Sequence, residues 1–170
     1  MIVEPDVFRC YQLPEHLVDA LIATEDVRFY DHHGTDARSF LRVLFKSLLM
    51  NDRSSGGGST ITQQLAKNMF GRASGGFMAL LSNKISELIM ARRIEKVYTK
   101  NEILTLYLNT VAFGENVFGI EAASARFFNK STVDLSIGES AVLVGMLKAN
   151  TYYNPRRNPE NARARRNVVL

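Results

Sequence analysis

The chain has 170 residues, 46% of them hydrophobic and 22% charged, and a formal net charge of +4. This length suits one compact domain with a sizeable core, and the apolar content excludes a disordered chain. Cys10 is the only cysteine, which excludes an intramolecular disulfide and a zinc site built from cysteines. No apolar run reaches the roughly 18 residues of a membrane-spanning helix, so we expect any membrane anchor to lie outside this chain. The mild basic excess suits an anionic partner such as phosphate, a phospholipid surface or nucleic acid.

The residue pattern predicts a mainly helical chain. Pro14 fits the first turn of a helix that ends at Glu25 and Asp26, and apolar residues at helical spacing predict a second helix over 36–50. Further helices are predicted over 60–68, 77–95, 102–109, 120–128 and 136–148, and from 158 onward.

Local signals mark the ends of several of these helices. Thr60, Thr99 and Ser136 are each followed three residues later by Gln or Glu, which indicates a capping box. The glycine- and serine-rich residues 51–59 are the one clearly flexible segment, and 111–113 form the best strand candidate.

The helix predicted over 36–50 carries a basic stripe. Arg38, Arg42 and Lys46 recur at intervals of four residues opposite its apolar side. A core helix with a solvated face is the commoner explanation of such a pattern. A helix that lies on an anionic membrane, with its apolar side buried, is the alternative.

The first cluster with chemical potential joins Glu25, Asp26, Phe29 and His32. A carboxylate in a partly apolar pocket has a raised pKa and can act as a general base near neutral pH. An exposed acidic helix end, with its histidines held by local hydrogen bonds, is the plainer interpretation. A histidine–carboxylate metal site is a third, but the adjacent His32 and His33 rarely both reach one ion.

The second cluster is a glycine-rich turn at 56–58 that leads through Ser59 and Thr60 into a helix. Glycines let the backbone approach a ligand, and the first amides of a helix can bind an anion. Four polar side chains can share one face of this helix: Gln63, Gln64, Lys67 and Asn68. A mobile loop before an ordinary helix cap is the alternative, since the Gly-Lys-Ser/Thr ending of a nucleotide-binding loop is missing.

The third cluster is the pair Lys84 and Glu87 within the helix predicted over 77–95. Taken alone, these residues are best explained as a surface ion pair worth a few tenths of a kcal/mol.

Together the clusters resemble the glycosyltransferase domain of class A penicillin-binding proteins and of monofunctional peptidoglycan transglycosylases. The first family motif, Glu-Asp-x-x-Phe-x-x-His-x-Gly, is met at 25–34, and the second, Gly-Gly-Ser-Thr-Ile-Thr-Gln-Gln-Leu-x-Lys-Asn, in full at 57–68. The fourth and fifth motifs are met within 103–128 and 139–145. The third departs from the family because Asn83 stands where the family has arginine, and Arg72 is our candidate for the missing cation.

The resemblance implies a lysozyme-like helical domain over 1–170, with a smaller membrane-associating lobe at roughly 35–76. It places the domain on the extracytoplasmic face of the bacterial inner membrane and strengthens the membrane interpretation of 36–50. The implied partners are lipid II, the growing glycan chain and other proteins of cell-wall synthesis.

The resemblance also implies a reaction: inverting glycosyl transfer that polymerises a lipid-linked disaccharide–pentapeptide and releases polyprenyl pyrophosphate. Glu25 is then the general base, and Glu87 the second catalytic carboxylate, which orders the phosphate's partners or a divalent metal such as Mg or Mn. The substrate-binding residues carried over are Asp26, Phe29, His32, Ser59, Thr60, Gln63, Gln64, Lys67, Asn68, Arg72, Lys84 and Asn109.

Two other functions stay open on the sequence. Two glutamates in a lysozyme-like fold could hydrolyse glycan, although hydrolysis offers no pyrophosphate for Lys67 to stabilise. A non-catalytic, membrane-binding helical module would not need Glu25 or Glu87. Nucleic acid is disfavoured because no basic helix with interleaved aromatic residues occurs. The chain has no Ser-x-x-Lys motif, so we expect no acylation by penicillin.

Overall fold

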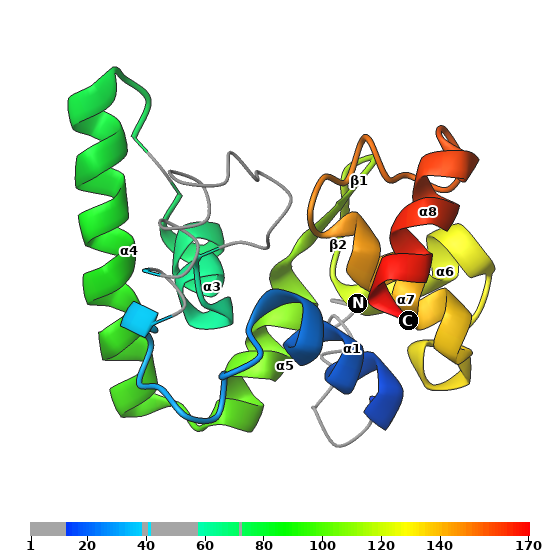
Figure 1. The fold of residues 1–170 in the computed structure, drawn as a ribbon, viewed down its shortest axis with the longest axis horizontal. Coiled ribbons are helices and arrows are strands. Elements are labelled where there is room, and N and C mark those ends of the chain that lie inside the picture. The colour runs from blue at the N-terminus through cyan, green and yellow to red at the C-terminus, as the bar shows by residue number, and fades with distance from the viewer. Residues whose placement is uncertain (1–12, 39–40, 42–57, 72) are drawn as a thin grey trace, which may run out of the picture. The chain divides into compact units, whose positions relative to one another are not determined.

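The computed structural model describes residues 13–38, 41, 58–71 and 73–170. Its elements are labelled in Figure 1. The helices are α1 (Glu15–Glu25), α3 (Ile61–Phe70), α4 (Phe77–Val97), α5 (Lys100–Thr110), α6 (Ile120–Phe128), α7 (Ile137–Met146) and α8 (Pro159–Val169), with a 3-10 turn η2 at Thr132–Asp134. The predicted mainly helical class is confirmed. Within the described residues, no helix combines the length and apolar character needed to cross a membrane.

The chain divides into two compact units. Unit 1 comprises Met1–Ala20 and Leu108–Leu170, and unit 2 comprises Leu21–Tyr107, so the division falls within α1 and α5. The lobe predicted over 35–76 lies within the sequence range of unit 2, and its extent stays a prediction.

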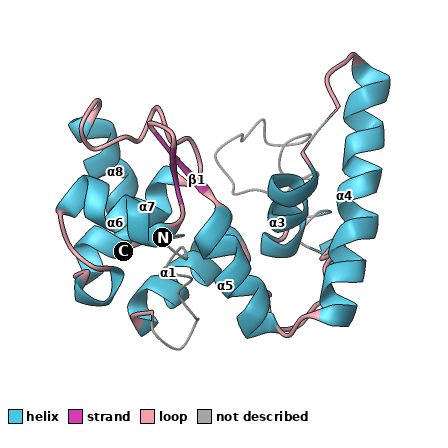
Figure 2. Cartoon of the chain, turned by 180° about the vertical axis from the view of Figure 1, so that it is seen from behind, coloured by secondary structure: helices cyan, strands magenta, loops and turns pink. Residues whose placement is uncertain are grey.

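Unit 1 is built on the packing of α7 against α8, which Figure 2 shows beside α6. Gly145 allows this packing, since a Cβ there would lie 3.0 Å from Cγ of Arg165 on α8. The unit also holds a hairpin of β1 (Ala112–Gly114) and β2 (Val117–Phe118). Its two turn residues, Glu115 and Asn116, both have positive φ, which gives a turn whose twist matches that of the two strands.

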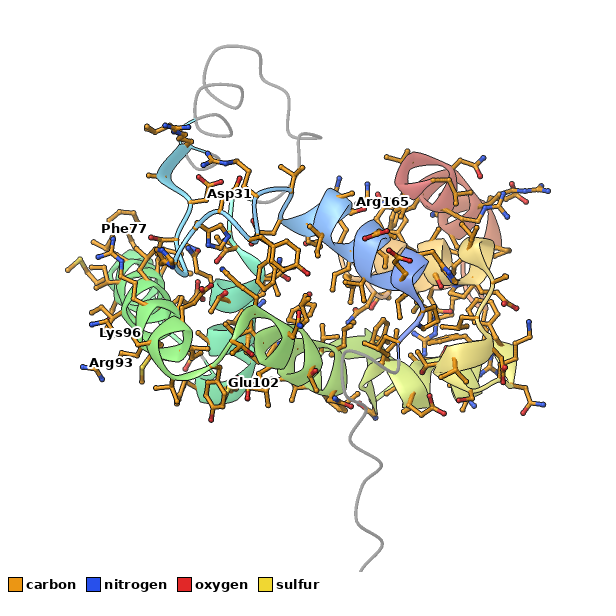
Figure 3. The ribbon with its side chains drawn as sticks, turned by 90° about the horizontal axis from the view of Figure 1, so that it is seen from below. Asp31, Phe77, Arg93, Lys96, Glu102 and Arg165 are labelled. Carbon is orange, nitrogen blue, oxygen red and sulfur yellow. The ribbon has the colours of Figure 1, made fainter. Side chains whose placement is uncertain are left out.

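Unit 2 is built on α3 packed against α4, an arrangement visible in Figure 1 and Figure 2. Ile61 and Leu65 of α3 and Ala91 of α4 are fully buried. The outer side of α4 carries exposed residues, including Phe77 at its start and Arg93 and Lys96 near its end (Figure 3). Gly34 brings the loop after α1 onto α4: its φ is +85°, and a Cβ there would lie only 2.7 Å from the Ala91 carbonyl oxygen.

The predicted helix ends are confirmed in two cases and half confirmed in a third. Thr99 with Glu102 and Ser136 with Glu139 form reciprocal capping boxes. Thr60 caps α3 by accepting from the Gln63 amide, but the Gln63 side chain bonds elsewhere.

Two sequence predictions fall mainly on residues that the structure does not describe. Of the helix predicted over 36–50, only 36–38 and 41 are described, so Arg42 and Lys46 of the basic stripe lie outside the described residues. Of the glycine-rich segment 51–59, only Gly58 and Ser59 are described. The strand predicted over 111–113 is observed one residue later, as β1.

The capping box of α7 predicts a pH-dependent stability. Glu139 accepts hydrogen bonds from Lys130 Nζ and from the Ser136 amide, both at 2.8 Å. These contacts, that of Lys130 first, lower the pKa of Glu139 from 4.5 to about 2. A carboxyl whose pKa is depressed by folding contributes stability above its unfolded-state pKa and loses it as the pH falls through the folded-state value.

We therefore expect Glu139→Gln to lower the free energy of unfolding by about 1 kcal/mol at pH 7. The difference from the parent protein should shrink as the pH falls from about 4.5 to 2. Urea unfolding followed by circular dichroism measures both, with Glu160→Gln on α8 as the exposed control. A difference that stays constant from pH 6 to pH 2.5 would contradict this account.

Candidate functional site

Glu25, the last residue of α1, is half-buried and is held by α3. The side-chain amide of Gln64 donates to Glu25 Oε2 at 3.0 Å. The carbonyl oxygen of the same amide accepts from the Tyr107 hydroxyl of α5 at 2.9 Å. Burial raises the pKa of Tyr107, and the negative charge of Glu25 raises it further. Gln64, which the family resemblance gave as a substrate-binding residue, therefore contacts the candidate base.

Asp26 is buried and joins the loop after α1 to the start of α3. Its Oδ2 accepts from His32 Nε2 at 2.9 Å and from the Ile61 amide at 3.0 Å. His32 Nδ1 accepts from the Gly34 amide at 3.2 Å, so Nε2 carries the proton that Asp26 accepts. Asp26 and His32 are each 6% exposed, so this pair is a buried support that joins the loop after α1 to the start of α3.

Two amides in the first turn of α3 have acceptors within the protein. The Ile61 amide donates to Asp26 and the Gln63 amide donates to Thr60 Oγ1. A helix N-terminus binds an anion through amides that lack a partner. These two amides are therefore not available to an anion, and binding of a phosphate here would rely on side chains as well.

A lysine provides the charge that such side-chain binding needs. Lys84 Nζ donates to Ser59 Oγ at 2.8 Å, to Gln63 Oε1 at 2.9 Å and to Glu87 Oε2 at 3.2 Å. Glu87 is 6% exposed, whereas 33% of the Lys84 side chain is exposed. The pair that looked like a surface contact in the sequence is thus a buried carboxylate that holds a solvent-accessible ammonium.

Lys84 and Gln63 line a cavity of about 360 Å³ between α4 and the loop after α1. Leu88 and Ile89 of α4 give it an apolar wall, and Arg92 adds a second cation. The two cations and the two aliphatic side chains share the α4 wall, and Asp36 adds a carboxylate from the loop after α1. A lining that combines cations with aliphatic side chains suits a ligand that joins an anionic group to an apolar one.

A second buried ion pair lies beneath this loop, and sequence analysis missed it. Lys100 Nζ lies 2.7 Å from Glu95 Oε2, donates to the His32 carbonyl at 2.7 Å and sits 4.5 Å from the centre of the Phe29 ring. Glu95 also accepts from Thr62 Oγ1 of α3 at 2.6 Å. The spacing of five residues between Glu95 and Lys100 crosses the junction of α4 and α5, so helical periodicity gave no signal for this pair.

The remaining predicted site residues take different places. Phe29 is fully buried, so it supports the loop and has no surface for a ligand. Lys67 and Asn68 are exposed on α3, one turn beyond Gln63 and Gln64. Asn109 belongs to unit 1, where its carbonyl faces Gly119. Arg72 lies outside the described residues.

Glu87 is the residue for which the sequence predicted a divalent metal. Among the described residues, no three His, Cys, Asp or Glu side chains gather in one place that could hold an ion. The positive charge next to Glu87 is that of Lys84. A divalent metal at this position therefore stays a prediction, and the chemistry below does not use one.

Comparison with known proteins decides the family. The family model described as transglycosylase matches residues 3–170. The chain belongs to the transglycosylase family. The predicted class, an enzyme that transfers glycosyl groups, is confirmed with it.

Similar proteins include three penicillin-binding proteins. Penicillin-binding protein 1F of Bacillus subtilis is 42% identical over 94% of this chain and 22% of its own length. Penicillin-binding protein 1A of Escherichia coli is 44% identical over 94% of the chain and 18% of its own length, and that of Aquifex aeolicus 41% over 94% and 21%. The transglycosylase chain thus spans about a fifth of the length of the relatives it matches.

The buried pair Glu95–Lys100 gives a stability prediction for the transglycosylase domain. Lys100→Met leaves the Glu95 carboxylate, 4% exposed, without its cation. Removal of one partner of a buried pair costs about 3–5 kcal/mol, so we expect a loss of that size in urea unfolding.

Two further variants separate charge from packing in this test. Lys96→Met removes an exposed lysine of α4 and should change the free energy of unfolding by less than about 0.5 kcal/mol. The double variant Glu95→Gln/Lys100→Met removes both charges and should recover part of the loss. A double variant no more stable than Lys100→Met would argue against the ion pair as the cause.

Proposed function

We propose that this domain polymerises a lipid-linked disaccharide–pentapeptide, lipid II, into glycan strands by inverting transfer, with Glu25 as the general base. Membership of the transglycosylase family and the likeness to penicillin-binding proteins support the reaction class. The arrangement of two adjacent glutamines supports the assignment of roles.

That arrangement is the observation on which the proposal rests most. Gln63 and Gln64 are consecutive in α3, so their side chains leave the helix in directions about 100° apart. Gln63 reaches Lys84, and Gln64 reaches Glu25. One turn of helix therefore organises a carboxylate on one side and an ammonium on the other, as a transfer from a charged leaving group requires.

In the proposed reaction, Glu25 accepts the proton of the 4-hydroxyl of the acceptor sugar as that oxygen attacks C1 of the lipid-linked donor. The bond from C1 to the pyrophosphate oxygen breaks, and polyprenyl pyrophosphate departs with the bonding electrons. Lys84 stabilises the charge that develops on this leaving group, with Lys67 as a further cation on α3. Glu87 acts by holding Lys84 in place.

Substitution of the base tests the assignment. Glu25→Gln keeps the side-chain shape but cannot accept the proton, and general base catalysis is worth about 10²–10⁴ in rate. We expect polymerisation of fluorescent lipid II to fall by at least about a hundredfold, while the circular dichroism spectrum is unchanged.

Glu15→Gln, an exposed carboxylate at the opposite end of the same helix, serves as the matched control and should keep full activity. Near-normal polymerisation by Glu25→Gln would remove Glu25 from the mechanism. Release of fragments from preformed glycan, without polymer formation from lipid II, would instead favour a hydrolase.

We further propose that the domain works at the extracytoplasmic face of the membrane and contacts lipid through α4. Phe77, Met78, Leu81, Ile85 and Ile89 are each between 46% and 77% exposed. Helical geometry places these residues on one stripe, which reaches the cavity that Ile89 and Lys84 line. A bilayer that covers this stripe would leave the lipid chain of a substrate next to the cavity.

Vesicle binding tests this surface. Transfer of a Phe or Met side chain from water to an apolar phase is worth about 1.5–3 kcal/mol. We therefore expect Phe77→Ser/Met78→Ser to sediment with phosphatidylglycerol vesicles at least tenfold more weakly than the parent chain. Val168→Ser on α8, equally exposed at 72%, is the control and should bind as the parent does. Equal losses in both variants would count against α4 as the lipid-binding face.

A further inference from the structure

Among the described residues of unit 2, Tyr107 is the largest side chain that is completely buried, yet its polar atom contacts the candidate site. It is 0% exposed, and its hydroxyl lies 2.9 Å from the Oε1 of Gln64. Gln64 Nε2 in turn lies 3.0 Å from Glu25 Oε2. Three side chains from α5, α3 and α1 thus form one hydrogen-bonded chain that ends at the proposed base.

The direction of each hydrogen bond in this chain follows from the chemistry of Glu25. An ionised carboxylate only accepts hydrogen bonds, so Gln64 must turn its NH₂ group toward Glu25. The amide oxygen then faces Tyr107, and the phenol must donate to it. Burial and the charge of Glu25 raise the pKa of Tyr107, which keeps the phenol protonated and able to donate.

We propose that Tyr107 is a positioning residue that fixes the Gln64 amide with its NH₂ toward Glu25 and thereby holds the base in its ionised form. This rests on the proposed role of Glu25. Tyr107 touches neither sugar nor phosphate in this proposal and acts only through Gln64.

The proposal has a direct consequence for protonation. Without the hydroxyl, the Gln64 amide is free to turn, and its oxygen can then accept from a protonated Glu25. A hydrogen bond to the neutral form of a carboxyl raises its pKa, whereas a bond to the charged form lowers it. Loss of the Tyr107 hydroxyl should therefore leave less of the base ionised at neutral pH.

Two other charged residues of the described part of unit 2, Asp26 and Lys67, have different surroundings. The Asp26 carboxylate is engaged by His32 and the Ile61 amide. Lys67 is exposed on α3, one turn beyond Gln64. Among the described residues, Gln64 is the side chain that donates to Glu25.

The test is Tyr107→Phe, which removes only the oxygen atom. With lipid II as the substrate, we expect kcat at pH 7 to fall about tenfold, in line with one lost hydrogen bond of about 1.4 kcal/mol. KM should stay within about twofold, because Tyr107 does not touch the substrate. The acidic limb of the pH–kcat profile should move to higher pH. Tyr98→Phe, which alters a 40% exposed tyrosine of the same unit, should leave the profile unchanged.

Repeating the Tyr107→Phe substitution in a Gln64→Leu protein distinguishes a positioning role of Tyr107 from a general contribution to the fold. Gln64→Leu removes the amide through which Tyr107 acts, and should itself move the acidic limb to higher pH. In that background Tyr107→Phe should cause no further change in kcat or in the profile. An equal loss in both backgrounds, or an acidic limb that Tyr107→Phe leaves in place, would overturn the proposal.

The Gln64→Leu variant also tests the proposal if Tyr107→Phe does not fold. An acidic limb of the pH–kcat profile that Gln64→Leu leaves in place would overturn the proposal as well. Failure of the proposed function gives a different result from failure of the positioning role. If Glu25→Gln stays active, Glu25 is not the base, and the proposed function fails. An inactive Glu25→Gln together with a wild-type profile for Tyr107→Phe rejects the positioning role alone.

Discussion

The carboxylate of Asp26 and the hydroxyl of Thr60 hold the first turn of α3, and the rest of the site depends on that turn. Asp26 accepts from the Ile61 amide, and Thr60 accepts from the Gln63 amide while donating to the Gly34 carbonyl at 2.8 Å. These bonds fix both the start of the helix and its rotation against the loop after α1. The directions in which Gln63 and Gln64 leave the helix follow from that rotation.

The Ile61 and Gln63 amides have partners within the protein, so these two donors of the helix start serve the structure. A buried amide without an acceptor would cost about 1–3 kcal/mol, so internal capping stabilises the apo protein. The charged groups of the candidate site, Lys84 and Glu25, contact the ends of the Gln63 and Gln64 side chains. The positive charge of Lys84 lies beside Glu87.

Sequence reasoning predicted the helices well because their start signals are local. The boxes at Thr99 and Ser136 involve residues three apart, and both are formed as expected. The Thr60 box was only half right, since tertiary contacts with Gly34 and Lys84 compete for the Gln63 side chain. Residues that contact one another across unit 2, such as Tyr107 and Gln64, leave no periodic signal that a single sequence could show.

The same limit explains how the motif residues were interpreted. The sequence around Glu25 and Gln63 indicated chemistry, whereas Lys84 and Glu87 taken alone suggested a surface ion pair. The roles of all three clusters were assigned by resemblance. The structure pairs Gln64 with Glu25 and turns Phe29 into the core, where the Lys100 ammonium covers its ring. Both outcomes depend on burial, which composition and spacing leave undetermined.

The described residues of unit 2 include two lysine–glutamate pairs, and their partners explain why one suits a ligand better than the other. Lys100 gives its donors to the buried Glu95 carboxylate and to a backbone carbonyl, and 19% of its side chain is exposed. Lys84 gives two of its donors to neutral groups, the Ser59 hydroxyl and the Gln63 amide, at the wall of a cavity. A hydrogen bond between an ammonium and a neutral oxygen is weaker than one to an anion, so an incoming phosphate can replace these two partners at a net gain. Lys100 contacts both oxygens of Glu95, at 2.8 and 2.7 Å, and donates to one neutral oxygen, the His32 carbonyl, so it has less to gain from such an exchange. The chain therefore uses the same residue pair once to hold a loop and once to hold a cation at the wall of a cavity.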